Sequence, residues 1–301
     1  MTVLLTGASG FLGRRVAELM LAKGEDVVAI GRSADASPSS GRFVSADLSD
    51  PGELRRAVEV IGPVDSIIHL AAMVPKSRSQ DEAVTAFEAN LMGTVRLLGA
   101  YDGVAKTIVF ASTAEVYGLP EAGGPIPEDA DLRPLSWYAA SKVGAETYCR
   151  TLERRTSMRL SILRFTVLYG AGDTIDRAIP NFVRSAVRDD PIRLFGGEEL
   201  RDYLHVDDAA RAVCLAWERR LSGTYNVGSG QGIAVRDAAR AVLAMTGAAS
   251  PIELLPREKR AADIVLDTSR FREATGFVPT RVFPQGLEEQ IAWTAAAGSG
   301  L

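Results

Sequence analysis

Short, continuously apolar runs alternate with stretches of helical periodicity along the first half of the chain, and this pattern constrains the fold most. The runs that predict strands lie at Val3–Thr6, Val27–Ile30, Phe43–Val44, Ser66–Ala72, Thr107–Ser112 and Ser161–Tyr169. The stretches that predict helices lie at Phe11–Ala22, Pro51–Ile61, Asp81–Tyr101 and Trp137–Arg155. Strands that are apolar throughout and separated by helices are typical of a parallel sheet covered on both faces. The sequence therefore predicts an α/β fold with a doubly wound parallel sheet, whose ligands bind beyond the carboxyl ends of the strands.

The composition is that of a soluble globular protein and excludes several classes. Of the 301 residues, 47% are hydrophobic and 24% are charged, close to the globular average. A net charge of −4 and a pI of about 5.4 leave no basic footprint for nucleic acid. No apolar run approaches the ~18 residues of a membrane helix, and the N-terminus lacks the pattern of a signal peptide. The two cysteines, Cys149 and Cys214, are not in a metal-binding spacing, so we expect a cytoplasmic protein without a metal site.

A glycine-rich turn directly follows the first predicted strand and opens the first predicted helix. It reads Thr6-Gly7-Ala8-Ser9-Gly10-Phe11-Leu12-Gly13. Glycines at these positions allow a tight turn that brings backbone N–H groups and a helix N-terminus against a pyrophosphate. The alternative is a tight turn that binds nothing. The position of the turn at the start of an alternating strand–helix pattern favours a dinucleotide-binding domain of the Rossmann type.

The end of the second strand bears on which dinucleotide would bind. A carboxylate about 20 residues after the glycine turn normally accepts hydrogen bonds from the ribose hydroxyls of NAD. This chain has Gly31 followed by Arg32, whose guanidinium can pair with a 2′-phosphate and so favours NADP. If Arg32 is only a solvated loop charge, NAD still fits. Asp47 and Leu48, after the third strand, either place a carboxylate near the adenine or form a simple turn.

Tyr138 and Lys142 are four residues apart on a predicted helix and therefore share one face. An ammonium group about 4 Å from a phenol, at an effective dielectric near 20, favours the phenolate by ~4 kcal/mol, or ~3 pKa units. We therefore expect the pKa of Tyr138 to fall from about 10 towards 7, which suits proton exchange with a sugar hydroxyl. Hydroxyl groups also end the fifth strand, where Ser112 or Thr113 can either hydrogen-bond a reacting oxygen or cap the following turn.

Four motifs in this order resemble the extended short-chain dehydrogenase/reductase superfamily. They are the glycine turn, the Ser-Thr-x-Glu-Val-Tyr-Gly block that begins at Ser112, the Tyr-x-x-x-Lys pair, and the run Arg201-Asp202-Tyr203-Leu204-His205-Val206-Asp207-Asp208. More narrowly, the chain resembles the NAD-dependent epimerase/dehydratase family of nucleotide-sugar enzymes, typified by UDP-galactose 4-epimerase. The resemblance covers nearly the whole chain.

The resemblance implies roles for individual residues. Tyr138 would be the catalytic base, Lys142 would hold the nicotinamide ribose and lower the tyrosine pKa, and Thr113, with Glu115 nearby, would act on the sugar. Together, motifs and resemblance predict these cofactor-binding residues: Gly7, Gly10, Phe11, Leu12, Gly13, Arg32, Asp47, Leu48, Leu70, Ala71, Ala72, Asn90, Tyr138 and Lys142. The predicted substrate-binding residues are Ser112, Thr113, Phe195 beside the nucleobase, and Arg201 and Arg260 on the diphosphate. Surface salt bridges are the alternative for both arginines.

Three departures from the family pattern bear on the reaction. No acidic residue ends the second strand, so NAD cannot be assumed. Val167 stands where family epimerases often carry asparagine, or threonine in those that act on uronic acids. Ala114 precedes Glu115 where 4,6-dehydratases carry an Asp-Glu pair, which disfavours a dehydratase. Glu115 itself is retained, as in UDP-glucuronate decarboxylases, so decarboxylation remains a weaker alternative.

The leading prediction is a nucleotide-sugar 4-epimerase that oxidises sugar carbon 4 transiently with a tightly bound NAD or NADP. The closest alternative is an NADPH-dependent reductase of a 4-keto nucleotide sugar, and a catalytically inactive dinucleotide-binding protein is a third. The expected partner is a nucleotide-diphosphate sugar, with no nucleic acid and no membrane.

The alternation of strands and helices loosens after about residue 166, which predicts two domains. We expect a dinucleotide-binding Rossmann domain at 1–165, to which 203–227 returns, and a smaller nucleotide-sugar-binding domain at 166–301. The family resemblance further implies a homodimer that pairs the helices at Asp81–Tyr101 and Trp137–Arg155.

Overall fold

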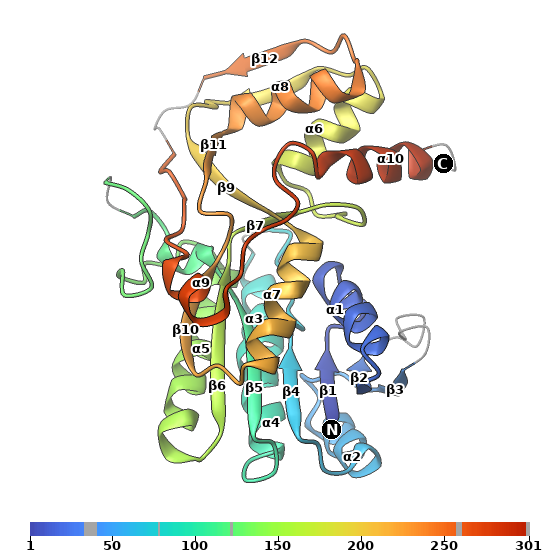
Figure 1. The fold of residues 1–301 in the computed structure, drawn as a ribbon, viewed down its shortest axis with the longest axis vertical. Helices are drawn as coiled ribbons and strands as arrows, with labels where there is room; N and C mark the ends of the chain where they lie inside the picture. Colours follow the sequence, from blue (N-terminus) through green and yellow to red (C-terminus); the bar gives the residue numbers. More distant parts are fainter. Residues whose placement is uncertain (33–40, 78, 121–122, 257–260, 299–301) are drawn as a thin grey trace.

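The computed structural model describes residues 1–32, 41–77, 79–120, 123–256 and 261–298, and its largest element is a seven-stranded sheet (Figure 1). The strands run in the order β10–β6–β5–β4–β1–β2–β3, and every neighbouring pair is parallel. Their bounds are β1 Thr2–Thr6, β2 Asp26–Gly31, β3 Arg42–Ser45, β4 Ser66–His69, β5 Thr107–Thr113, β6 Arg159–Phe165 and β10 Gly223–Val227. The strand order reverses at β1, which lies between β2 and β4, as in a doubly wound sheet. The predicted fold class is confirmed.

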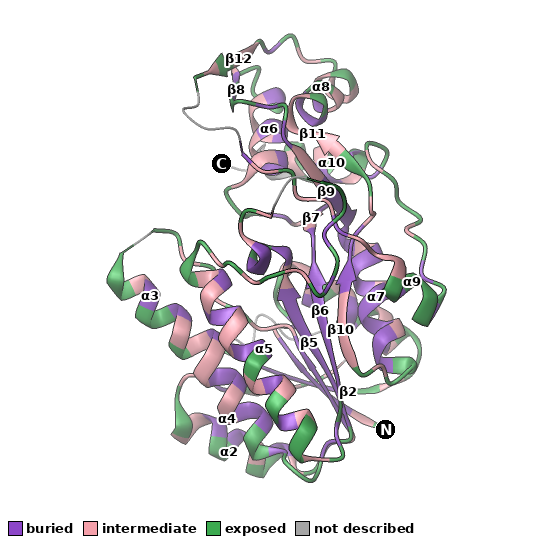
Figure 2. Ribbon diagram, turned by 90° about the vertical axis from the view of Figure 1, so that its left-hand side faces the viewer, coloured by how far each residue is buried: buried purple, intermediate pink, exposed green. Residues whose placement is uncertain are grey.

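Helices cover both faces of this sheet, because each presents an apolar stripe to strands that are apolar on both sides. Two helices, α1 and α7, pack on one face, and α2, α4 and α5 pack on the other. Their bounds are α1 Phe11–Ala22, α7 Val206–Glu218, α2 Pro51–Ile61, α4 Gly93–Ala100 and α5 Trp137–Arg155. Figure 2 shows the buried strands of the sheet between the layer that contains α2, α4 and α5, on the left, and α7 on the right. The carboxyl ends of the strands remain accessible to the rest of the molecule.

Three predicted elements differ in the structure. The predicted strand Ser161–Tyr169 is divided into β6 and a short strand β7 (Val167–Tyr169), because the chain leaves the central sheet at Thr166 and joins a second sheet. The predicted helix Asp81–Tyr101 consists of α3 (Gln80–Ala86), a π-helical turn η2 (Phe87–Met92) and α4. The predicted strand Ser66–Ala72 ends at His69. A π-helical turn inside a helix often marks a functional site.

A smaller part of the molecule lies beyond the carboxyl ends of the central strands (Figure 1). It contains a sheet in the order β11–β9–β7, the pair β12–β8, and the helices α6, α8 and α10, which share a separate apolar core. The bounds are β8 Ile192–Phe195, β9 Leu200–His205, β11 Gly232–Ala234, β12 Ile252–Leu255, α6 Ala178–Val187, α8 Val235–Thr246 and α10 Leu287–Gly298. Two short elements complete the fold: η3 (Ala114–Tyr117) after β5, and α9 (Ser269–Thr275) beside β10. None of the helices in the described ranges is both long enough and apolar enough to cross a membrane.

Candidate active site

The glycine turn between β1 and α1 has a geometry that requires glycine at two positions. Gly7 has a φ of +72°, and a Cβ atom there would lie 2.7 Å from the backbone nitrogen of Ala71. A Cβ atom on Gly13 would lie 2.0 Å from the carbonyl oxygen of Gly7. Gly10 caps α1 without a side-chain hydrogen bond, and the turn lines a large cavity together with Phe11 and Leu12. A helix N-terminus that is left open in this way fits the pyrophosphate of a dinucleotide.

A buried histidine holds the end of β4 against this turn. The two ring nitrogens of His69 hydrogen-bond with Thr6 Oγ1 at 2.6 Å and with Thr94 Oγ1 at 2.9 Å. Thr6 Oγ1 also accepts a hydrogen bond from the backbone nitrogen of Ala71 at 3.0 Å. Burial lowers the pKa of His69 to about 3, so the imidazole is neutral at physiological pH. The segment after β4 is therefore fixed opposite Gly7, and Leu70 and Ala72 of that segment line the cavity.

Asn90, in the π-helical turn η2, ties the same segment to the helix that carries Tyr138. Its Oδ1 accepts from the backbone nitrogen of Met73 at 2.7 Å, and its Nδ2 donates to the Met73 carbonyl and to Ser141 Oγ, both at 2.9 Å. Asn90 is 1% exposed. Asn90 and Ala71 are not among the described residues that line the cavity. Both residues lie behind it and support the residues that form its wall.

The predicted adenosine-binding residues lie at the carboxyl ends of β2 and β3. Arg32 is exposed, and its carbonyl accepts a hydrogen bond from Ser45 Oγ at 3.3 Å. The carboxylate of Asp47 accepts from the backbone nitrogen and the hydroxyl of Ser49, at 2.8 and 2.6 Å. Burial raises the pKa of Asp47, but these bonds and the charge of Arg32 outweigh it and lower the pKa. Asp47 therefore caps its own turn within electrostatic reach of Arg32, while Leu48 packs into the core.

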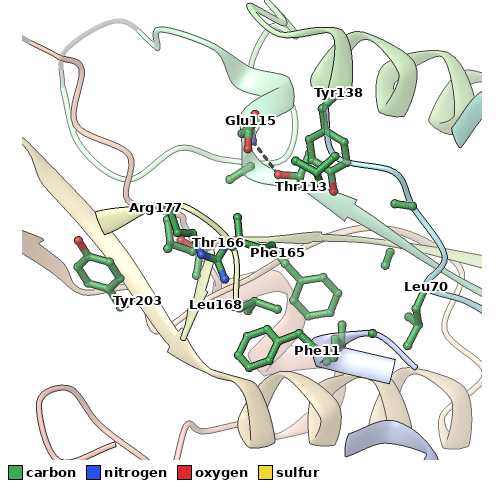
Figure 3. Close-up of a pocket in the computed structure, with 18 of the residues that line it drawn as sticks. Phe11, Leu70, Thr113, Glu115, Tyr138, Phe165, Thr166, Leu168, Arg177 and Tyr203 are labelled. Atoms are coloured by element: carbon green, nitrogen blue, oxygen red, sulfur yellow. Dashed lines mark hydrogen bonds between the residues drawn. The ribbon is translucent and has the colours of Figure 1, made fainter. Parts of the chain in front are cut away.

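Tyr138, Lys142 and Thr113 line one part of the cavity, where the start of α5 meets the end of β5 (Figure 3). The helix begins after Ser136, whose Oγ accepts from the backbone nitrogen of Ala139 at 3.1 Å. Lys142 is 1% exposed, and its Nζ donates to the carbonyl of Ala111 at 2.7 Å. Burial lowers the pKa of Lys142 to about 8, so the ammonium form still predominates at neutral pH.

The expectation that Lys142 lowers the pKa of Tyr138 is wrong for this structure. Burial raises the pKa of Tyr138 well above its usual value, the carboxylate of Glu115 raises it further, and the guanidinium of Arg177 opposes them. The Lys142 ammonium contacts the carbonyl of Ala111. The four-residue spacing does place both side chains at the same cavity, but burial of the phenol and the charge of Glu115 together outweigh the charge of Arg177. The Tyr138 phenol is therefore protonated at neutral pH in this structure.

The two hydroxyl groups at the end of β5 have different surroundings. Ser112 is 4% exposed, and its Oγ donates to Glu146 Oε1 at 2.6 Å. Thr113 is half-buried, and its Oγ1 accepts from the backbone nitrogen of Glu115 at 3.2 Å. Glu115 is exposed at the cavity and accepts a hydrogen bond from Ser136 Oγ at 3.1 Å. Both residues line the cavity, but the Ser112 hydroxyl donates to Glu146, so the Thr113 hydroxyl is the better placed to donate to a ligand.

The cavity has a volume of about 1260 Å³ and reaches from α1 to β9. This exceeds the ~300–1,000 Å³ typical of pockets for a single small ligand. Arg201 lines it from β9, and its Nη1 donates to the carbonyls of Leu200 and Ala262 at 2.8 and 2.7 Å. Phe195 is 61% exposed and is absent from the described lining. Arg260 lies outside the described residues.

Arg177, which no sequence pattern indicated as a site residue, precedes α6 and lines the cavity (Figure 3). Its guanidinium contacts Asp173 Oδ2 through Nε at 3.2 Å and Nη2 at 2.8 Å, and Asp173 is 2% exposed. The charge of Arg177 acts on both Tyr138 and Tyr203. An acid and an arginine four residues apart were the only sign of this pair in the sequence, and that spacing is common on protein surfaces.

Comparison with known proteins gives consistent results over most of the chain. The model of the NAD dependent epimerase/dehydratase family matches residues 3–228. A UDP-glucose 4-epimerase of Mycolicibacterium smegmatis is 31% identical over 97% of this chain and 97% of its own. A dTDP-4-dehydro-6-deoxy-D-allose reductase of Streptomyces bikiniensis is 28% identical over 97% of this chain and 95% of its own. The structure of the Thermus thermophilus UDP-glucose 4-epimerase in complex with NAD matches with a TM-score of 0.89 at 30% identity, covering 99% of this chain and 100% of that one.

Proposed function

The chain belongs to the NAD-dependent epimerase/dehydratase family and is an NAD(P)-dependent nucleotide-sugar enzyme, and on this premise we propose that it is a nucleotide-sugar 4-epimerase. The observation that carries the proposal is one continuous cavity. The glycine turn lines it on one side, Thr113, Tyr138 and Lys142 line it at the junction of β5 and α5, and Arg201 lines it from β9. Its volume of about 1260 Å³ exceeds the range usual for a single small ligand, as expected of a site that takes a cofactor and a substrate.

The chemistry that a bound nicotinamide supplies is the reversible oxidation of the sugar at carbon 4. As the phenolate, Tyr138 would accept the proton of the carbon-4 hydroxyl, and as the phenol it would return that proton to the oxygen once the keto sugar has rotated. Because burial raises the pKa of Tyr138, the phenolate would need the positive charge of an oxidised nicotinamide beside it. Thr113 donates a hydrogen bond to the same oxygen and so fixes its position. Lys142, cationic at neutral pH, would lie one helical turn from Tyr138 at the same cavity and hold the nicotinamide ribose, and Arg201 would bind the diphosphate.

We further propose that the dinucleotide is NADP. Gly31 leaves the end of β2 without a carboxylate for the ribose hydroxyls, and Arg32 follows it as an exposed guanidinium. Arg32 would pair with the 2′-phosphate. The same observation favours a second candidate, an NADPH-dependent reductase of a 4-keto nucleotide sugar, in which these site residues act in a net reduction.

Identification of the nucleotide released from the denatured, purified protein separates the two candidates. A near-stoichiometric amount of NADP⁺ or NAD⁺ supports an epimerase, because a cofactor regenerated in each turnover can stay bound. Protein that is empty but binds NADPH on titration favours the reductase. Failure to bind either dinucleotide would contradict both proposals. Arg32→Ala should weaken binding of NADP while leaving the affinity for NAD unchanged.

Tyr138→Phe tests the proton-transfer role. We expect turnover of the nucleotide sugar to fall by about 10²–10⁴-fold, the usual contribution of general acid–base catalysis. Tyr148→Phe is the matched control, because Tyr148 lies on the same helix and its hydroxyl donates to the carbonyl of Val95 at 3.3 Å. Unchanged turnover in Tyr138→Phe would exclude every enzymatic mechanism based on this residue.

Two organisational proposals accompany this function. We assign residues 1–165 and 203–227 to the dinucleotide-binding domain and the rest of 166–301 to nucleotide-sugar binding. We also propose a homodimer in which each subunit contributes two helices, α3–α4 and α5, to the interface; Val84 on α3 is 55% exposed. Light scattering on the purified protein should give twice the mass of the chain, and Val84→Glu should lower that mass.

A further inference from the structure

The carboxylate of Glu146 lies on the same face of α5 as Tyr138 and Lys142, further into the interior of the protein. Tyr138, Lys142 and Glu146 follow one another at intervals of four residues, so they lie along one face of the helix. Tyr138 and Lys142 line the cavity. Glu146 has a fully buried side chain and lies one turn further from the opening.

Two successive residues of β5 hold this face of the helix. The carbonyl of Ala111 accepts from Lys142 Nζ at 2.7 Å, and the next residue, Ser112, donates from Oγ to Glu146 Oε1 at 2.6 Å. The residue after Ser112 is Thr113, whose hydroxyl lies at the cavity. The two contacts therefore fix the position of α5 along β5. This in turn fixes the position of Tyr138 relative to Thr113.

The carboxylate of Glu146 is itself held from two further sides. Arg164 on β6 donates to its two oxygens, from Nε at 3.0 Å and from Nη2 at 2.7 Å, and Arg150 donates to Oε2 at 3.0 Å. Burial raises the pKa of Glu146, but the hydrogen bonds from Arg164 and Ser112 outweigh it and lower the pKa. Arg164 in turn donates from Nη1 to Tyr117 and to the carbonyl of Glu128, both at 2.9 Å. A bidentate pair fixed in this way has little freedom to move.

We propose that Glu146 is a positioning residue for proton transfer, which holds the Ser112–Thr113 end of β5 and the Lys142 turn of α5 in one relative position. The proposal rests on the proposed function, because the group it positions is the proton-transfer pair of Thr113 and Tyr138. Glu146 does not touch the cavity and acts only through Ser112 and Lys142. A carboxylate that only stabilised the fold would affect the amount of folded protein and not the rate of each folded molecule.

Ser112→Ala tests the connection with the smallest change, since the Glu146–Arg164 pair stays intact. We expect kcat per folded enzyme to fall about tenfold, with KM for the nucleotide sugar within about twofold of the wild type, because small misplacements of reacting groups lower the rate steeply. Glu146→Gln should lower kcat further, by about a hundredfold. Arg150→Ala is the matched control, because Arg150 contacts the same carboxylate from a side chain that is 32% exposed, and its kcat should stay unchanged.

A second measurement needs no substrate. The chain has only five lysines, so ¹³C labelling at Cε gives five signals, and Lys142→Met assigns the one of interest. The charge of Glu146 raises the pKa of Lys142 against the larger effect of burial. Glu146→Gln should therefore shift the titration of Lys142 to lower pH, and Arg150→Ala should leave it unchanged.

The outcomes separate this proposal from the proposed function. If the wild type is inactive as an epimerase but the Lys142 titration shifts in Glu146→Gln, the proposed function fails and the link between Glu146 and Lys142 stands. If the wild type is active, and both Ser112→Ala and Glu146→Gln keep its kcat per folded enzyme, the positioning role is overturned. Should Glu146→Gln fail to fold, the kcat of Ser112→Ala decides.

Discussion

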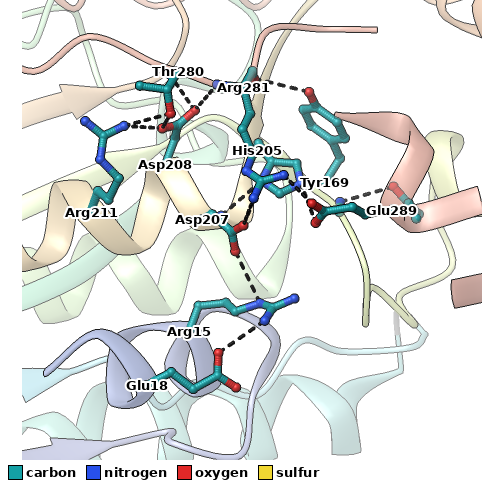
Figure 4. A network of polar contacts seen from close by, with 12 residues as sticks. Arg15, Glu18, Tyr169, His205, Asp207, Asp208, Arg211, Thr280, Arg281 and Glu289 are labelled. Atoms are coloured by element: carbon teal, nitrogen blue, oxygen red, sulfur yellow. Dashed lines mark hydrogen bonds and ion pairs between the residues drawn. The ribbon is translucent and has the colours of Figure 1, made fainter. Parts of the chain in front are cut away.

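Two charged networks in this molecule differ in burial and therefore in what they can do. In the interior network, the side chains of Glu146 and Arg164 are 0% and 3% exposed. The second network, which we call the junction network, consists of Asp207 on α7, Arg281, and Glu289 on α10. Arg281 pairs with each of the two acids, and the side chains of Asp207, Arg281 and Glu289 are 26%, 42% and 42% exposed (Figure 4). The interior network holds one geometry, because a buried charge would be left unpaired if its partner moved away. The junction network can exchange its partners for water.

The two histidines of the chain are both buried, but they differ in how completely their ring nitrogens are hydrogen-bonded. His69, beside the glycine turn, has a hydrogen-bonding partner on each ring nitrogen. His205, in the junction network, accepts from the backbone nitrogen of Asp207 at 3.2 Å, and its Nε2 has no hydrogen-bonding partner among the described residues. Its nearest acidic neighbours are Asp207 and Glu289, at 3.8 and 3.9 Å. The histidine beside the glycine turn is thus fixed by completed hydrogen bonds, whereas the histidine in the junction network has one ring nitrogen without such a bond among the described residues.

The largest effect on stability should come from Arg164→Met. The substitution leaves the Glu146 carboxylate buried without its main partner, which typically costs about 3–5 kcal/mol. Urea unfolding followed by circular dichroism would give the free energy of unfolding. A loss below about 1 kcal/mol would show that water reaches Glu146, and would remove the contrast between the two networks.

The double variant Glu146→Gln/Arg164→Met sharpens this prediction. With both charges removed, neither member of the pair is left as an unpaired ion, so the free energy of unfolding should recover to within about 2 kcal/mol of the wild type. Activity should not recover with it, because the carboxylate that holds the end of β5 and the Lys142 turn of α5 in position is still missing. Recovery of both together would mean that the network serves stability alone.

A smaller effect is expected from pH. The pKa of His69 is about 3 in the folded state and 6.5 as its ordinary value, so the unfolded chain takes up a proton between these values and the folded chain does not. Stability from this group is therefore complete above pH 6.5 and is lost as pH falls, by about 2 kcal/mol between pH 6.5 and 5. His69→Gln should show a flatter pH dependence of the free energy of unfolding than the wild type. Identical slopes in the two proteins would contradict the pKa.

The sequence could predict the features that depend on local patterns, but not those that depend on contacts between residues distant in sequence. The fold class and the residues around the cavity followed from local patterns: apolar strands, a glycine turn and a four-residue spacing. The direction of the Tyr138 pKa shift did not follow, because it depends on burial by residues distant in sequence. Arg177 was missed for a similar reason, since a loop residue becomes part of a site only when the chain folds back over the sheet. Ser112 and Thr113 could not be separated until the structure showed Glu146 beside one of them.

The smallest effect should come from Arg281→Met in the junction network. Arg281 pairs with Asp207 at 3.2 Å and with Glu289, but its side chain is 42% exposed. Exposed pairs contribute about 0–1 kcal/mol, and salt screens them. We therefore expect the free energy of unfolding to fall by less than about 1 kcal/mol in low salt and by less still in high salt. Asp207 has a second partner, Arg15 on α1, at 3.2 Å, so removing Arg281 does not leave it unpaired. A loss as large as that of Arg164→Met, unaffected by salt, would show that the junction is as rigid as the interior and that burial alone does not separate the two networks.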